Sequence, residues 1–263
     1  MTHAELNRLR ERRDASALLF DVDGTLAPIV PRADDARVPE GVRERIAGLA
    51  SRYALVACVS GRRAVDARRV VGLDMITYIG NHGYELLAPG ATAPAVNPAA
   101  AARAERPASF LAGLDSAELG ELGIRGEDKG PIQALHWRGA PDETAARERL
   151  RRVALEAQIQ GLVTHWGRKV LELRPVSGVD KGTAVHALLA ERAPLAAALY
   201  AGDDRTDLDA FRAVRALEES GRVGVAVCVG IASDEGPRQI REEADLVLAG
   251  PEAIGGLLAE LEG

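Results

Sequence analysis

Two aspartates stand two residues apart directly after the apolar segment 17–20 and are the first candidates for chemistry. Side chains alternate along a strand, so Asp21 and Asp23 project to the same side while the chain stays extended. Two adjacent carboxylates repel each other, and a hard cation such as Mg²⁺ relieves that repulsion by taking oxygen ligands. Gly24 permits a sharp turn after the pair. We predict a metal-assisted site here; the alternative is an Asx turn that only closes the strand.

A second acidic cluster follows the apolar segment 196–201 and consists of Asp203, Asp204 and Asp207. Three carboxylates within five residues are costly without a cation. Asp204 and Asp207 stand three residues apart and can share one face of a helix. The alternative is an acidic first helical turn, which the helix dipole favours.

Two further polar segments could hold an anion. Ser60 and Gly61 end the apolar segment 54–60 and precede a predicted helix, where a hydroxyl and free amides form an anion site. Lys181 opens another predicted helix and would add a positive charge there. A capping serine and a solvated surface lysine are the alternatives.

The elements that must position these residues alternate between apolar strands and amphipathic helices. Ligands bind at the carboxyl ends of the strands in an open sheet of this kind, which is where the polar residues stand. We therefore predict an α/β fold with a doubly wound parallel sheet. The expected strands are 17–21, 54–60, 75–79, 84–87, 196–201, 223–229 and 245–248, and the expected helices are 39–52, 62–71, 181–192, 208–217 and 254–261.

A smaller α+β module interrupts this alternation. It begins in the Ala- and Pro-rich stretch 88–102, which carries little pattern of its own. Two pairs of neighbouring strands with a helix between them indicate a separate layer of structure. We therefore expect a core of residues 1–88 and 175–263 and an inserted domain of residues 89–174. The expected inserted elements are helices at 99–114 and 142–160 and strands at 123–127, 132–137, 162–166 and 170–173.

Composition limits the kinds of partner. Lys and Arg number 33 against 39 Asp and Glu, so there is no basic excess of the kind that binds nucleic acid. No apolar stretch reaches the length of a membrane span, and the polar segment 1–14 lacks the apolar centre of a secretory signal. We expect a cytoplasmic protein without nucleic-acid or membrane partners; the oligomeric state stays open.

Four of these segments occur in an order that marks a known superfamily. The sequences DVDGTL (21–26), VSGR (59–62), DKG (180–182) and GDDRTD (202–207) resemble the motifs of the haloacid dehalogenase-like phosphatases. The resemblance implies a doubly wound core with a cap inserted between the second and third motifs.

The same resemblance implies a role for each motif residue. Asp21 would be the nucleophile that forms an aspartyl-phosphate, and Asp23 the general acid and then the general base. Ser60, Gly61 and Lys181 would hold the phosphoryl oxygens. Mg²⁺ would be bound by the Asp21 carboxylate, the Asp23 main-chain carbonyl and Asp203, with Asp204 and Asp207 nearby.

The inserted region narrows the range of possible substrates. Residues 80–85, 127–129, 136–138 and 167–175 resemble the cap-region signatures of trehalose-6-phosphate phosphatases. This resemblance implies trehalose 6-phosphate as the small-molecule substrate. Phosphatases of other disaccharide or glycosyl-glycerate phosphates, a sugar phosphomutase and a nonenzymatic binding relative are the alternatives. The residues implied to recognise the disaccharide are Glu127, Lys129, Arg138, Lys169 and Glu172.

Overall fold

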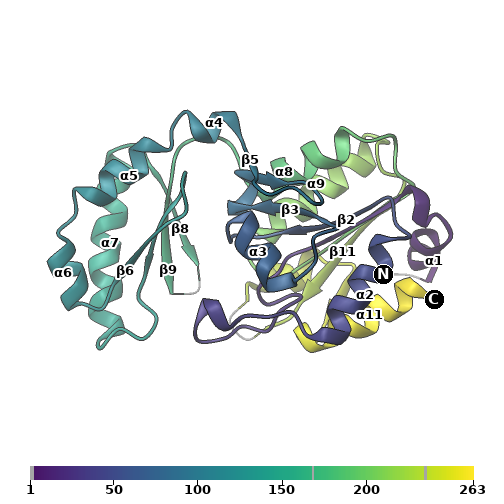
Figure 1. The fold of residues 1–263 in the computed structure, drawn as a ribbon, viewed down its shortest axis with the longest axis horizontal. Coiled ribbons are helices and arrows are strands. Elements are labelled where there is room, and N and C mark those ends of the chain that lie inside the picture. Colours follow the sequence, from purple (N-terminus) through teal and green to yellow (C-terminus); the bar gives the residue numbers. More distant parts are fainter. Residues whose placement is uncertain (1–2, 168, 234–235) are drawn as a thin grey trace. The chain divides into compact units, whose positions relative to one another are not determined.

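The computed structural model describes residues 3–167, 169–233 and 236–263, so Arg168 of the cap-region signature lies outside the described residues. The chain forms two compact units, drawn in Figure 1. The core unit comprises Met1–Ala95 and Val179–Gly263, and the inserted unit comprises Val96–Gly178. The sequence-based boundaries after residues 88 and 174 fall earlier in the chain, because the Ala- and Pro-rich stretch still contributes a short strand to the core sheet.

The core unit is built on an eight-stranded sheet with the order β12-β11-β10-β1-β2-β3-β4-β5. Strands β12 through β3 in this order pair in parallel, and β4 is antiparallel to β3. This order confirms the doubly wound sheet predicted from the alternating pattern. The strands are β1 (Ser16–Phe20), β2 (Leu55–Val59), β3 (Thr77–Gly80), β4 (Glu85–Leu87), β5 (Ala95–Val96), β10 (Ala197–Gly202), β11 (Ala226–Ile231) and β12 (Leu246–Leu248).

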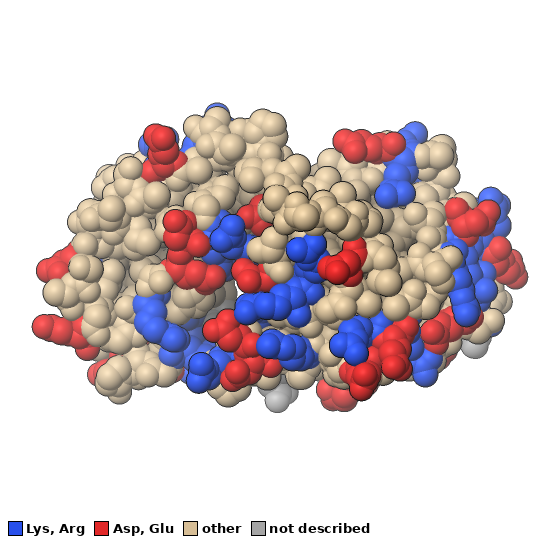
Figure 2. Space-filling model, viewed as in Figure 1, with Lys and Arg blue, Asp and Glu red and all other residues tan. Residues whose placement is uncertain are grey.

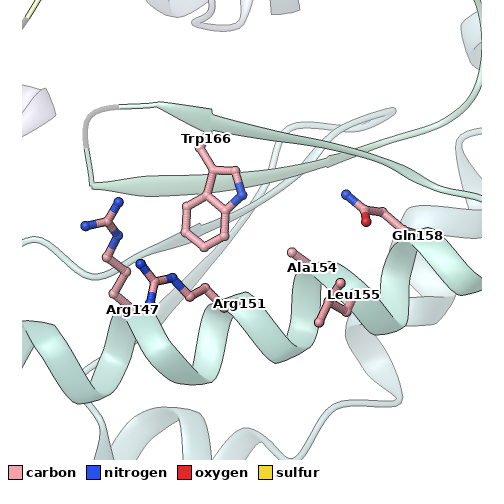
Figure 3. Close-up of a pocket in the computed structure, with 6 residues that line it drawn as sticks. All are labelled: Arg147, Arg151, Ala154, Leu155, Gln158 and Trp166. Carbon is pink, nitrogen blue, oxygen red and sulfur yellow. The ribbon is translucent and has the colours of Figure 1, made fainter.

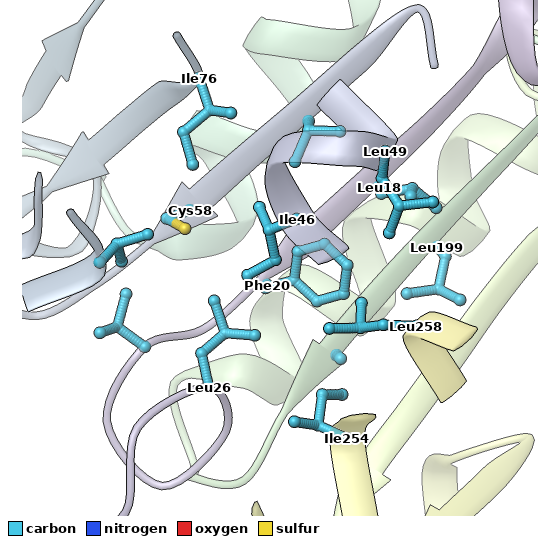
Figure 4. Close-up of a cluster of buried hydrophobic side chains, with 14 of the residues drawn as sticks. Leu18, Phe20, Leu26, Ile46, Leu49, Cys58, Ile76, Leu199, Ile254 and Leu258 are labelled. Carbon is cyan, nitrogen blue, oxygen red and sulfur yellow. The ribbon is translucent and has the colours of Figure 1, made fainter. Parts of the chain in front are cut away.

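Helices cover both faces of this sheet. Leu18 and Phe20 of β1 belong to one apolar cluster, whereas Ala17 and Leu19 belong to another, as the alternation of a strand requires. Figure 4 shows Phe20 among side chains of the helices on its face. That face is covered by α1 (His3–Glu11), α2 (Glu40–Ala50), α3 (Ala64–Val71) and α11 (Ile254–Glu262), and the other by α8 (Lys181–Ala190), α9 (Asp207–Glu219) and α10 (Arg238–Glu243).

The inserted unit has its own antiparallel sheet in the order β6-β7-β9-β8 and its own apolar cluster. Leu150 of the long helix packs there with Leu135 and Leu171 of the sheet. The single helix predicted at 99–114 is two helices, and α6 was not predicted. The elements are α4 (Pro98–Ala101), α5 (Glu105–Ala112), α6 (Ser116–Glu121), α7 (Glu143–Ile159), β6 (Arg125–Asp128), β7 (Gln133–His136), β8 (Val163–Gly167) and β9 (Val170–Arg174).

The surface carries charges of both signs. On the face shown in Figure 2, basic and acidic side chains lie interspersed. This mixture agrees with the near balance of charges in the sequence. Among the described residues, none of the helices combines the length and apolar character that a membrane span requires.

Candidate active site

Three of the predicted site residues lie where three neighbouring strands end. Strand β1 lies between β10 and β2, with Phe20 opposite both Ala201 and Cys58. The ladder continues one residue further, because the Asp21 amide donates to the Ala201 carbonyl at 2.8 Å. The side chains of Asp21, Ser60 and Asp203 are all buried at this edge. The parallel register therefore brings three segments from distant parts of the sequence together.

The turn after Asp21 packs tightly against the second acidic cluster. Gly24 has a φ of +89°, and a Cβ placed there would lie 2.3 Å from Oδ2 of Asp203. The Thr25 hydroxyl donates to Oδ1 of Asp203 at 3.3 Å. Glycine is thus required at position 24 both by backbone conformation and by the approach of this carboxylate.

Lys181 is a buried cation between two carboxylates. Its Nζ lies 2.6 Å from Oδ1 of Asp21 and 2.7 Å from Oδ1 of Asp207. Asp180 starts helix α8 in front of it through a capping box with Thr183. Burial alone would lower the pKa of Lys181, but the carboxylates of Asp207 and Asp21 outweigh burial and raise it. The lysine is therefore a fixed positive charge in the site and not a solvated surface group.

Asp207 organises the loop that carries the acidic cluster. Its Oδ2 accepts hydrogen bonds from the amides of Asp203 at 3.0 Å and Asp204 at 2.9 Å. Its Oδ1 accepts from Lys181 and from the hydroxyl of Tyr200, each at 2.7 Å. Tyr200 was not predicted as a site residue, since a tyrosine inside an apolar strand carries no chemical signature of its own.

Three carboxylates form a group that fits a metal ion. Each of Asp21, Asp203 and Asp207 is buried and offers an oxygen atom, and these atoms lie within 4.8 Å of one another. Burial raises the pKa of Asp21 well above its usual range; Lys181 lowers it, while Asp207 and Asp203 raise it further. One ammonium group cannot neutralise three carboxylates, so the donor set suits a divalent cation.

The structure does not bring the side chains of Asp23 and Asp204 into this group. Asp23 forms a bidentate ion pair with Arg62, with Nε–Oδ2 at 2.6 Å and Nη2–Oδ1 at 2.7 Å. Oδ1 of Asp204 accepts from the Arg205 amide at 2.7 Å. The turn after β1 carries the Asp23 carboxylate toward Arg62, so the main-chain carbonyl of Asp23 stays the predicted metal ligand and its carboxylate is not one.

The Ser60–Arg62 loop is held by the turn that follows β3. The His82 amide donates to the Ser60 carbonyl at 3.0 Å, and the Asn81 amide donates to the Arg62 carbonyl at 2.6 Å. A Cβ at Gly61 would lie 2.6 Å from Nε2 of His82, so the imidazole occupies the space above this glycine. The loop that could hold a phosphate is thus preshaped by its neighbour.

Glu85 connects that turn to the start of α3 through two hydrogen bonds. Its Oε1 accepts from Nδ2 of Asn81 at 2.9 Å, and its Oε2 accepts from the Ala64 amide at 2.7 Å. The second bond satisfies a buried amide in the first turn of α3, which has no acceptor within the helix. Asn81 and His82 have φ values of 49° and 56°, a left-handed conformation that these contacts support. The sequence signature 80–85 is therefore a local structural unit.

The candidate sugar-binding residues of the inserted unit include a buried charged cluster. Nζ of Lys129 lies 3.0 Å from Oε1 of Glu172, and Nη2 of Arg174 lies 2.5 Å from Oε2 of the same carboxylate. Glu127 and Glu172 align through Ala134 across β6, β7 and β9, so they share a sheet face. Arg174 was not predicted as a site residue, although its spacing of two from Glu172 places it on the same face.

The other candidates of this unit are also paired. Oε2 of Glu127 lies 2.7 Å from Nε2 of His136, and this hydrogen bond lowers the pKa of Glu127. Nζ of Lys169 lies 2.7 Å from Oε2 of Glu143. Arg138 follows β7, and its carbonyl accepts from the Arg125 guanidinium at 3.4 Å.

A separate groove lies between α7 and β8 of the inserted unit (Figure 3). Arg147, Arg151, Leu155 and Trp166 are among its lining residues. The predicted site residues are not among those that line it. Trp166 instead packs edge-on against Trp137, with ring centroids 5.6 Å apart, which supports a packing role for both indoles.

Comparison with known proteins agrees with this geometry. The family model described as trehalose-phosphatase matches residues 19–243. A trehalose-phosphate phosphatase of Mycobacterium avium is 40% identical over 208 residues, which cover 76% of this chain and 51% of the relative. The chain thus spans about half the length of this curated relative.

Solved structures share the fold. The C-terminal domain of Candida albicans trehalose-6-phosphate phosphatase covers 99% of this chain and 96% of its own, with a TM-score of 0.78 and 22% identity. A haloacid dehalogenase-like hydrolase of Bacteroides thetaiotaomicron covers 94% and 98%, with a TM-score of 0.61 and 16% identity. These neighbours confirm the predicted core and cap architecture. Because the family model matches most of the chain, the protein belongs to the trehalose-phosphatase family.

Proposed function

We propose that this chain is a phosphatase that hydrolyses trehalose 6-phosphate to trehalose and inorganic phosphate. The observation that carries the proposal is the buried arrangement of Asp21 and Asp203, at the strand ends, with Lys181 at the start of α8. It pairs a carboxylate nucleophile with a fixed positive charge in a chain of the trehalose-phosphatase family. Phosphoryl transfer depends mainly on positioning and on neutralising charge, and these groups supply both.

In this mechanism an oxygen of Asp21 attacks phosphorus, and the bond to the sugar oxygen breaks in line. Lys181 offsets the negative charge on the phosphoryl oxygens, and Ser60 and Gly61 hold those oxygens at the end of β2. Water then attacks the aspartyl-phosphate, which releases phosphate and restores the carboxylate.

Asp23 is proposed as the acid and then the base. As an acid it protonates the departing sugar alkoxide, and as a base it takes a proton from the hydrolytic water. Both oxygens of its carboxylate are held by Arg62 in the structure. The ion pair must therefore open, or exchange one oxygen, before Asp23 can transfer a proton.

We propose Mg²⁺ as the divalent ion. Asp21 and Asp203 would hold it with their carboxylates, and the main-chain carbonyl of Asp23 would add a third ligand. When bound, the ion lowers the repulsion between the nucleophile and the phosphate dianion. We propose that Asp207 supports this site as an anchor, because both of its oxygens already accept hydrogen bonds. Asp204 would lie near the ion, outside the group of carboxylates formed by Asp21, Asp203 and Asp207.

The inserted unit is proposed to recognise the sugar. Glutamate oxygens accept hydrogen bonds from hydroxyls, and lysine and arginine donate to them. The buried pair of Lys129 and Glu172 offers both kinds of group. Glu127, Lys169 and Arg138 complete the proposed set.

The test is phosphate release from a panel of sugar phosphates with Mg²⁺ and then with EDTA. We expect the highest kcat/KM for trehalose 6-phosphate, full loss of activity with EDTA, and recovery when Mg²⁺ is restored. A clear preference for sucrose phosphate or a glycosyl-glycerate phosphate would mean that this ester, and not trehalose 6-phosphate, is the substrate. Phosphate transfer between hydroxyls without net release would indicate a mutase, and binding without turnover of any ester would reject the enzymatic assignment.

A further inference from the structure

Tyr200 donates a hydrogen bond to one of the buried carboxylates of the candidate active site. It lies on β10, three residues before Asp203, and its side chain is fully buried. Its hydroxyl donates to Oδ1 of Asp207 at 2.7 Å. The ring packs edge-on against Phe211, with centroids 5.9 Å apart. Burial, the contact with Phe211 and the hydrogen bond together hold the hydroxyl against the carboxylate.

The contact places Tyr200 one step from the proposed reacting groups. Oδ1 of Asp207 receives the tyrosine hydroxyl and the Lys181 ammonium, and its other oxygen receives two backbone amides. A carboxylate oxygen accepts about two hydrogen bonds, so all acceptor positions of Asp207 are used. Asp207 is therefore held at both ends, and the position of Oδ1 is set in part by Tyr200.

The ammonium of Lys181 is shared between two carboxylates. Nζ lies 2.6 Å from Oδ1 of Asp21 and 2.7 Å from Oδ1 of Asp207, so both carboxylates attract it. The tyrosine hydroxyl takes up part of the charge on Asp207, which weakens the pull from that side. Without the hydroxyl, Oδ1 of Asp207 would keep the hydrogen bond from Lys181 but lose the one from Tyr200. The less neutralised oxygen would then draw the ammonium away from Asp21.

We infer that Tyr200 is a positioning residue that acts through Asp207 to keep the Lys181 ammonium against Asp21. This role rests on the proposed function, because it matters only if Lys181 serves phosphoryl transfer to Asp21. A structural tyrosine would affect stability alone, whereas a positioning tyrosine affects kcat. Lys181 has to neutralise the negative charge on the phosphoryl oxygens in the transition state. A displaced ammonium should therefore lower kcat more than it changes KM.

Tyr200→Phe removes the hydroxyl and leaves the ring against Phe211. We expect kcat to fall about 10-fold or more, the usual effect of losing one hydrogen bond to a charged group, with KM changed less than about twofold. Tyr78→Phe is the matched control. Tyr78 is also buried in the core sheet, and its hydroxyl donates to the Leu73 carbonyl at 2.6 Å. Both variants lose one buried hydrogen bond, but only the first touches the carboxylates.

Melting curves establish that both variants fold, and steady-state kinetics on an aryl phosphate and on trehalose 6-phosphate give kcat and KM. Equal kcat values for the wild type and for both variants would overturn the inference. So would a fall in kcat that Tyr78→Phe shares. If the wild type releases no phosphate from any ester, the proposed function fails and this role falls with it.

A double-mutant cycle tests the route through Asp207. If Tyr200 acts through that carboxylate, adding Tyr200→Phe to Asp207→Asn should change kcat by less than about twofold, since the target of the hydroxyl is already altered. Multiplicative losses in kcat would show that Tyr200 acts by another route and would refute the positioning role.

Discussion

Replacing Lys181 with methionine should destabilise the fold more than any exposed lysine does. The substitution keeps much of the side-chain volume and removes the ammonium group from between Asp21 and Asp207. The lysine side chain is 3% exposed, so the two carboxylates cannot recover water in its place. Breaking a buried ion pair by removing one partner costs about 3–5 kcal/mol. Asp207 keeps Tyr200 and two amides, so we expect the lower end, about 3 kcal/mol.

The pH dependence of this loss has a defined sign. Lys181 is the neighbour that lowers the pKa of Asp21, while burial, Asp207 and Asp203 raise it. Without the lysine, the pKa of Asp21 in the folded state rises further above its unfolded value of about 3.9. A carboxyl of this kind destabilises the fold fully above its folded pKa and not at all below its unfolded pKa. The deficit should therefore shrink as the pH is lowered from 7 to 5.

The assay is urea denaturation of the wild type, Lys181→Met and Lys169→Met at both pH values. Lys169 pairs with Glu143 at the surface and is 40% exposed, so its loss should cost no more than about 1 kcal/mol. Saturating Mg²⁺ should restore part of the stability of Lys181→Met, because the ion offsets the same carboxylates. A deficit below about 1 kcal/mol at pH 7, or one that grows as the pH falls, would refute the picture of a buried cation between two carboxylates.

Three other substitutions test separate parts of the site. Asp21→Asn should abolish turnover with little change in melting temperature, since an amide is a poor nucleophile; substantial residual activity would reject the covalent mechanism. Gly24→Ala should raise the Mg²⁺ concentration needed for half-maximal activity, because its Cβ would lie 2.3 Å from Asp203, whereas Gly90→Ala, with φ at +70° and no atom within 4 Å, should cost stability alone. Glu172→Ala should lower kcat/KM for trehalose 6-phosphate roughly 5- to 150-fold and spare a small aryl phosphate, which has no sugar hydroxyls. Equal losses of Glu172→Ala on both substrates would assign this residue to the fold of the inserted unit.

The sequence alone determined most strands and helices of the core and the strand and helix ends where the candidate catalytic residues stand. Apolar segments such as Leu55–Val59 are readable because a parallel strand buried on both faces needs a continuous apolar run. Asp21 stands at the end of a predicted strand and Lys181 at the start of a predicted helix, and the resemblance of their motifs to a known superfamily implied their roles. Helices α1 and α10 were missed, since short polar segments carry little periodicity of their own.

Only the tertiary structure decided which polar groups meet. Asp23 and Asp207 both belong to acidic segments that follow apolar strands, yet the first pairs with Arg62 and the second with Lys181 and Tyr200. Arg62 lies 39 residues from Asp23, and Lys181 lies 160 residues from Asp21. These partners are set by strand order and register, which arise from packing the whole sheet between its helices. A carboxylate's neighbours in a folded chain therefore follow from long-range packing, whereas its position at a strand end follows from local pattern.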